Sequence, residues 1–129
     1  MRFRYTIFYV DSVPETLAFY ERAFGLSRGF LHESEDYGEL DTGAVTLSFS
    51  SRELMTSLGK PTLEHNPKNP VFEISLETDD VKAALARALK AGARLEQDVR
   101  DEEWGQTTSY VSDPNGFLIA ICSPVQMSD

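Results

Sequence analysis

The chain has 129 residues, 41% of them hydrophobic, which suits one ordinary domain that buries its own core. Its 21 acidic and 12 basic residues give a formal charge of −9, which argues against nucleic acid or an anionic membrane as a partner. Cys122 is the only cysteine, so no intramolecular disulfide can form; no apolar run reaches membrane-spanning length, and we expect no signal peptide. We therefore expect a cytoplasmic protein with cationic or neutral small-molecule partners, although the charge could serve solubility alone.

The first half predicts a helix set among strands. Residues 2–10 alternate as a strand does, with both faces apolar enough to be buried. Ser12 is a candidate N-cap, with Glu15 three residues later as in a capping box, and Gly25 is a candidate C-cap, which predicts a helix between them. Three further strand-like runs follow at 28–33, 37–41 and 44–50.

The second half repeats this order after a long connection. Residues 51–70 lose the periodicity and read as a linker or a flap, with one helical turn at 52–58. A second apolar strand at 71–77 leads into a helix capped by Thr78-Asp79-Asp80, whose apolar stripe ends at Gly92. A strand at 93–96 follows, and the acidic run Asp98–Glu103 is predicted to be a solvated loop.

The last hairpin is the clearest local signal. Residues 107–112 and 117–122 are rich in β-branched, aromatic and aliphatic side chains, and Asp113-Pro114-Asn115-Gly116 supplies the turn between them. Trp104-Gly105 just upstream suggests a loop that folds the indole back toward the sheet. We predict a single domain over 1–129, made of module one at 1–50, a connection or flap at 51–70 and module two at 71–125.

Four pieces in this order resemble the vicinal oxygen chelate superfamily, which includes glyoxalase I, bleomycin-resistance proteins and extradiol dioxygenases. They are Tyr5–Asp11 leading into Leu17–Tyr20, Leu76–Val81 before a helix that ends at Ala91–Ala93, Trp104–Gln106, and Asp113–Gly116. The resemblance covers nearly the whole chain. It implies an α+β fold of two βαβββ modules, whose curved mixed sheets enclose a cleft, and a homodimer.

The metal enzymes of that superfamily hold their ion at four positions on the first and last strands of the modules. Carried over one at a time, these positions fall on Tyr5, Ser48, Glu73 and Ala120, of which only Glu73 is a good ligand. Shifting the alignment by one residue restores no set of ligands. His32 and His65 lie away from all four positions and are predicted to be surface residues. We therefore predict no catalytic metal and no other cofactor.

Glu73 is the main candidate for a functional carboxylate. Strand alternation places it toward the cleft if Phe72, Ile74 and Leu76 face the core, and it could act as a general base or pair with a cationic guest. It could equally lie on a wet sheet face or pair with a structural arginine. Tyr5, Tyr9 and Ser48 would share the cleft face, and Tyr110 could join them.

Trp104 could form a cleft wall, or it could plug the sheet end or a dimer contact. Cys122 is interpreted as a small buried hydrophobic residue rather than a nucleophile.

The resemblance lies nearest to the metal-free bleomycin-resistance-like members, which implies a metal-independent protein that binds an aromatic or cationic small molecule. The alternative is a lyase or isomerase of the glyoxalase I type with a non-standard site, using Glu73 as base or metal ligand. A third possibility is a cleft filled by its own side chains, with function at an external surface.

Overall fold

The computed structural model describes residues 1–43 and 45–126. These residues form two compact units that divide between Glu64 and His65, inside the predicted connection at 51–70. Each unit contains the elements of one βαβββ module, as the sequence predicts.

The first unit consists of the following elements: β1 Tyr5–Val10, α1 Val13–Phe24, β2 Ser27–Leu31, β3 Tyr37–Asp41, β4 Thr46–Ser51 and the short α2 Arg52–Ser57. Its described strands form a four-stranded sheet in the order β1-β4-β3-β2. β1 runs parallel to β4, and the other neighbours are antiparallel. The predicted strand start at Ala44 lies outside the described residues.

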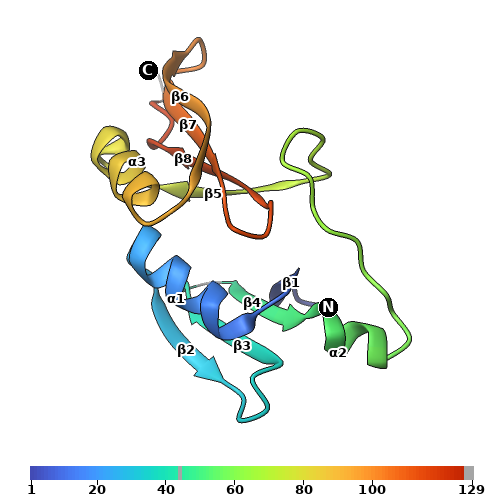
Figure 1. Ribbon diagram of the computed structural model, residues 1–129. Coiled ribbons are helices and arrows are strands. Elements are labelled where there is room, and N and C mark those ends of the chain that lie inside the picture. Colours follow the sequence, from blue (N-terminus) through green and yellow to red (C-terminus); the bar gives the residue numbers. More distant parts are fainter. Residues whose placement is uncertain (44, 127–129) are drawn as a thin grey trace. The chain divides into compact units, whose positions relative to one another are not determined.

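The second unit repeats this topology with β5 Glu73–Glu77, α3 Val81–Lys90, β6 Arg94–Glu102, β7 Gln106–Ser112 and β8 Leu118–Cys122. Its described strands pair in the order β5-β8-β7-β6, again with one parallel pair, β5 with β8. In Figure 1, α1 packs on one side of its own sheet, and α3 does the same on the other sheet.

Both long helices begin and end where the sequence predicts. The Ser12 hydroxyl accepts a hydrogen bond from the Glu15 amide at 3.3 Å, and the Asp80 carboxylate accepts one from the Ala83 amide at 3.0 Å. Gly25 ends α1 in the left-handed conformation at φ 69°, which glycine adopts without steric cost. The buried faces of α1 and α3 then pack on their sheets and form the two cores.

The last hairpin also forms as predicted, but the acidic stretch before it does not. Residues 98–102 belong to β6 and are not a solvated loop. Among the described strands, β6 pairs only with β7, and the pairing register shifts twice along it, between Leu95 and Gln97 and between Gln97 and Arg100. The backbone of an edge strand can pair while its charged side chains remain in water, so composition alone misled the prediction.

Candidate functional site

Each sheet has one face that its helix leaves uncovered. On β1, Tyr5, Ile7 and Tyr9 are 43%, 41% and 39% exposed, whereas the alternate residues Phe8 and Val10 are 1% and 0% exposed. Phe8 pairs with Phe49, whose ring contacts Tyr20 of α1, so the buried side is the one that carries the helix. We call the uncovered side of the β1–β4 sheet the first open face and that of the β5–β8 sheet the second open face. The predicted burial of both faces of the first strand is therefore wrong for the uncovered face.

Strand register defines the first open face. Ser48 on the central strand β4 pairs with Ile7 of β1 on one edge and with Glu39 of β3 on the other. The three side chains therefore form a row on one face, across β1, β4 and β3. Tyr5 and Tyr9 flank the row on β1, as the sequence predicts for them. Ser48 is fully buried beneath its larger neighbours and forms the floor of the face.

Tyr37 and Glu39 are site candidates that the sequence analysis missed. The Tyr37 hydroxyl donates a hydrogen bond of 2.7 Å to Glu39 Oε2, and both side chains are half-buried. Burial raises the pKa of the Tyr37 phenol, a hydrogen bond with Ser48 lowers it, and the hydrogen bond to Glu39 raises it again. The alternation of Tyr37–Asp41 could have placed both on one face, but not shown which face stays uncovered.

The second open face carries Glu73. Ser75 and Tyr110 both pair with Ala120, so Glu73, Ser75 and Tyr110 project from the same side of the sheet. The Tyr110 hydroxyl lies 3.5 Å from Glu73 Oε1, and the Ser75 hydroxyl lies 3.5 Å from Glu73 Oε2. The structure thus brings Tyr110 to Glu73. Glu73 is the first residue of β5, however, because the strand begins two residues later than predicted.

The electrostatics of this pair favour a neutral phenol beside a carboxylate. Burial raises the pKa of Tyr110, and the charge of Glu73 raises it further. Burial also raises the pKa of the Cys122 thiol, with smaller contributions from Glu77 and Glu73, which agrees with its interpretation as a buried, unreactive side chain. Among the described residues, the ion pairs include neither Glu73 nor Glu39, so no arginine neutralises either carboxylate there.

Trp104 is an exposed residue of the turn that leads into β7. It sits in the turn between β6 and β7 with 57% of its surface exposed, and its indole N–H donates to Gln106 Oε1 at 2.8 Å. Gly105 turns the chain at φ 88°, as the sequence predicts, and the indole hydrogen bond reaches the first residue of β7. The nearby amide acceptor satisfies the N–H at the tip of the hairpin. The role of Trp104 in a ligand site stays a prediction.

His32 is exposed, as predicted, but His65 is not a surface residue. The His65 ring stacks on Phe117 with centroids 4.9 Å apart and meets Phe72 edge-on at 5.4 Å. Its Nε2 atom is buried, with no hydrogen-bond partner among the described residues. No periodic pattern indicates this contact, because it joins an irregular connection to the residue between a turn and β8.

The metal positions implied by the family resemblance can now be tested against the chain's own donors. Tyr5 and Ser48 share the first open face, while Glu73 and Ala120 share the second, in matching registers. Ala120 offers no donor, and its neighbours along β8, Ile119 and Ile121, offer none either. No group of three or more His, Cys, Asp or Glu side chains suited to a metal occurs in the described part of the chain. The residues present do not fit the metal site of the family's metal enzymes.

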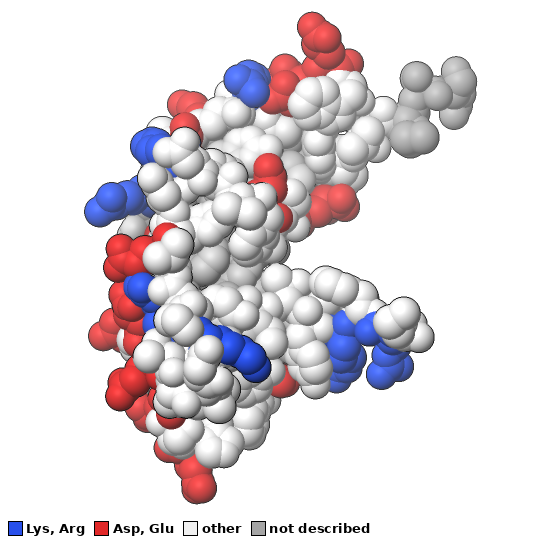
Figure 2. All heavy atoms as spheres, turned by 90° about the vertical axis from the view of Figure 1, so that its right-hand side faces the viewer, with Lys and Arg blue, Asp and Glu red and all other residues white. Residues whose placement is uncertain are grey.

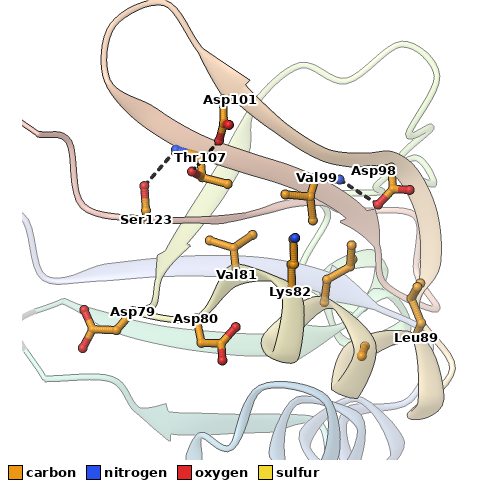
Figure 3. A pocket seen from close by; sticks show the side chains of 12 residues that line it. Asp79, Asp80, Val81, Lys82, Leu89, Asp98, Val99, Asp101, Thr107 and Ser123 are labelled. Carbon is orange, nitrogen blue, oxygen red and sulfur yellow. Dashed lines mark hydrogen bonds between the residues drawn. The ribbon is translucent and has the colours of Figure 1, made fainter.

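A separate groove of about 750 Å³ lies between α3 and the β6–β7 hairpin (Figure 3), on the side of the second sheet that carries α3. Four acidic side chains line it, and three of them have structural hydrogen bonds. Asp80 caps α3, Asp98 accepts from the Val99 amide at 2.7 Å, and Asp101 accepts from the Thr107 hydroxyl at 2.9 Å. The fourth is Asp79.

The charge pattern directs attention to the open faces instead. In Figure 2, acidic side chains are scattered over the visible surface, basic ones are grouped in a few places, and broad areas carry no charge. Against that background, Glu39 and Glu73 are carboxylates held by tyrosine hydroxyls on faces rich in aromatic and small side chains. These two tyrosine–carboxylate pairs are the best candidates for ligand recognition.

Comparisons with known proteins agree with this architecture. Solved structures with similar folds include a glyoxalase-related enzyme from Fulvimarina pelagi, with a TM-score of 0.82, 14% identity, and coverage of 100% of this chain and 99% of that one. A glyoxalase/bleomycin resistance protein/dioxygenase family enzyme from Burkholderia phytofirmans PsJN has a TM-score of 0.77 at 20% identity, covering 95% and 98%. TioX from Micromonospora sp. ML1 has a TM-score of 0.71 at 18% identity, covering 95% and 98%.

At these identities the likeness to solved structures establishes the fold alone, and no curated protein matches the chain. Sequence comparison with protein families gives the assignment. Residues 2–121 match the glyoxalase/bleomycin resistance protein/dioxygenase superfamily, which confirms the resemblance drawn from the motifs. The chain belongs to this superfamily.

Proposed function

We propose that this protein is a metal-independent small-molecule binding protein that takes an aromatic or cationic guest, as the bleomycin-resistance members of its superfamily do. The observation that carries the proposal is Glu73, a carboxylate on an uncovered sheet face with no cationic partner among the described residues. Two hydroxyls, from Tyr110 and Ser75, lie within 3.5 Å of it. A guest ammonium or guanidinium would supply the missing positive charge.

The aromatic character of the first open face supports the same proposal. Tyr5 and Tyr9 expose large rings beside Ile7, and flat apolar guests pack well on such surfaces. We further propose that the protein is a homodimer, as the family resemblance implies. Analytical ultracentrifugation should give twice the monomer mass, and a monomer at micromolar concentration would contradict the dimer.

The test is equilibrium dialysis of chelator-treated protein against matched cationic and neutral aromatic compounds. We expect at least one cationic compound to bind in the micromolar range, and Glu73→Gln to weaken it by about tenfold or more through loss of a charge-assisted interaction. Glu77→Gln is the matched control, because it removes the same charge from the same face of β5. Equal losses in the two variants, or no binding to wild type, would contradict the proposal.

The rival function is an enzyme of the lyase or isomerase type that uses Glu73 as a base. The specific observation in its favour is the same phenol–carboxylate pair, in which Tyr110 could donate a proton while Glu73 accepts one. It predicts that Glu73→Gln abolishes turnover of a glyoxalase-type substrate while the fold and the oligomeric state remain intact. An unchanged rate would exclude this role for Glu73.

A further inference from the structure

The first open face already holds a planar cation of its own. Arg4 precedes β1, and its guanidinium carbon lies 4.8 Å from the centre of the Tyr5 ring. Arg4 Nη1 also donates to the Thr46 hydroxyl at 2.8 Å, and Thr46 pairs with Tyr5 in the sheet. The guanidinium therefore lies over the open face beside Tyr5, stacked as a cation on an aromatic ring.

The Arg4 guanidinium has no carboxylate partner among the described ion pairs, and the Glu39 carboxylate on the same face has no cationic partner. Among the described residues, neither Arg4 nor Glu39 takes part in an ion pair. Tyr37 uses one acceptor site on Glu39 Oε2. A carboxylate offers about four lone-pair sites, so Glu39 can still accept a bidentate cation.

The backbone positions of Tyr5 and Glu39 are well separated on the sheet. Tyr5 lies on β1 and Glu39 on β3, with β4 between them, and their registers differ by two residues. Two strand spacings of about 4.8 Å and a shift of about 6.6 Å along the strands separate them by roughly 12 Å. The row Ile7–Ser48–Glu39 runs directly between β1 and β3, with a buried serine at its centre.

This row fits a guest that is apolar at one end and cationic at the other. A ring over Ile7 would contact the exposed Tyr5 and Tyr9 rings, because all three project from β1 on the same face. Ser48 is fully buried in the row, so the guest would lie across the face from Ile7 to Glu39 without entering the sheet. A planar cation suits this end better than an ammonium, because it matches a carboxylate in a bidentate fork and stacks on tyrosine as Arg4 does.

We propose that the first open face is a site for a guanidinium or amidinium joined to an aromatic ring, with the cation on Glu39, the ring over Ile7, and Arg4 as a displaceable competitor. This inference rests on the proposed function, since it names the class of guest, but it concerns residues other than Glu73. Arg4 competes because its charge lies on the same face and occupies the Tyr5 ring that the guest would contact.

The experiment is calorimetric titration of the chelator-treated full chain with benzamidinium, with benzylammonium as a non-planar cation and benzamide as a neutral analogue. We expect benzamidinium to bind most tightly. Glu39→Gln should weaken it by at least about tenfold. Arg4→Ala should tighten it about two- to fivefold by removing a cation–π competitor.

Glu33→Gln is the charge-matched control, because Glu33 is exposed and follows β2 in the same unit. Equal effects of Glu39→Gln and Glu33→Gln would overturn the proposal. Unchanged or weaker binding by Arg4→Ala would overturn the role of Arg4. A shift of the Arg4 side-chain Nε–H NMR signal on adding benzamidinium to wild type tests the same contact without a substitution, and an unmoved signal would count against it.

Two outcomes separate this inference from the proposed function. If Glu73→Gln abolishes benzamidinium binding while Glu39→Gln does not, the inference fails and the proposed function stands. If no cationic aromatic compound binds wild type, both fail. A guanidinium could also come from the arginine of a peptide, so a blocked Gly-Arg-Gly peptide is titrated in parallel; tighter binding of the peptide would overturn the aromatic part of the assignment.

Discussion

Gly116 allows the connection between the units to pack on the last hairpin. It lies in the turn before Phe117 with φ 86°, and a Cβ built on it would collide with the backbone carbonyl oxygen of His65. The His65 ring stacks on Phe117 directly beyond this point. We predict that Gly116→Ala forces the backbone at His65 away from the turn and weakens that stack.

The cost can be worked out from two contributions. A residue with a Cβ in the left-handed region costs about 1–2 kcal/mol. Weakening an aromatic contact of this kind costs about a further 0.5–1.5 kcal/mol. Gly92→Ala is the matched control, because Gly92 lies in the same unit at φ 110° and a Cβ there would meet nothing within 4 Å. The Gly92→Ala variant should lose only the backbone contribution, so its free energy of unfolding should exceed that of Gly116→Ala by roughly 1 kcal/mol.

Urea denaturation followed by tryptophan fluorescence measures this difference, because Trp104, the single tryptophan, lies in the same unit as both glycines. A loss for Gly116→Ala no larger than that for Gly92→Ala would refute the reasoning. The His65 ring proton signals should also lose the shift caused by the Phe117 ring. A larger loss for Gly116→Ala would show that the connection is anchored at His65, and the residues near His65 would then not form part of a mobile flap.

The remaining predictions concern titration, capping and the tryptophan. Burial and a neighbouring carboxylate raise the pKa of Tyr37 and Tyr110 above the ordinary 10.0, so both phenols should titrate late in an alkaline absorbance titration, and each Tyr→Phe variant should remove one late component. Each phenol has a higher pKa in the folded protein than in the unfolded chain, so it contributes its full stabilisation below pH 10 and loses it as pH rises through the raised pKa. The Tyr→Phe variants should therefore lose less stability than wild type over that pH range. Glu73→Gln should bring the Tyr110 titration back toward lower pH, and an unmoved titration would contradict the pairing. Ser12→Ala should lower the free energy of unfolding by about 1 kcal/mol in urea denaturation, and a neutral result would contradict its capping role. If Trp104 contacts the guest, its emission should change on binding, whereas unchanged emission would leave it outside the site.

Signals local in the sequence predicted most of the fold. The Ser12 cap, the Gly25 stop and the Asp113–Gly116 turn each depend on a few neighbouring residues, and all three form as predicted. The repeat of strand, capped helix and strands then follows from periodicity. Tyr5, Tyr9 and Ser48 fell on one face for the same reason, because alternation fixes which side chains share a face.

Features that depend on tertiary context could not be predicted. Residues 98–102 form an edge strand because β7 offers its backbone, which their charged side chains do not reveal. Glu39 gains its interest only once α1 is seen to cover the other face of the sheet. The contact of His65 with Phe117 joins residues far apart in the sequence, and no pattern in either segment indicates it.

We propose that the site works without a metal ion, since the implied ligand positions include Ala120 and the described residues hold no suitable group. Elemental analysis tests it most directly, on protein purified without chelator and on protein incubated with excess nickel, zinc, manganese or iron and then desalted. We predict far less than one metal ion per chain in both samples, and we expect cationic guests still to bind after chelator treatment. A near-stoichiometric metal that also restores guest binding or turnover would contradict it.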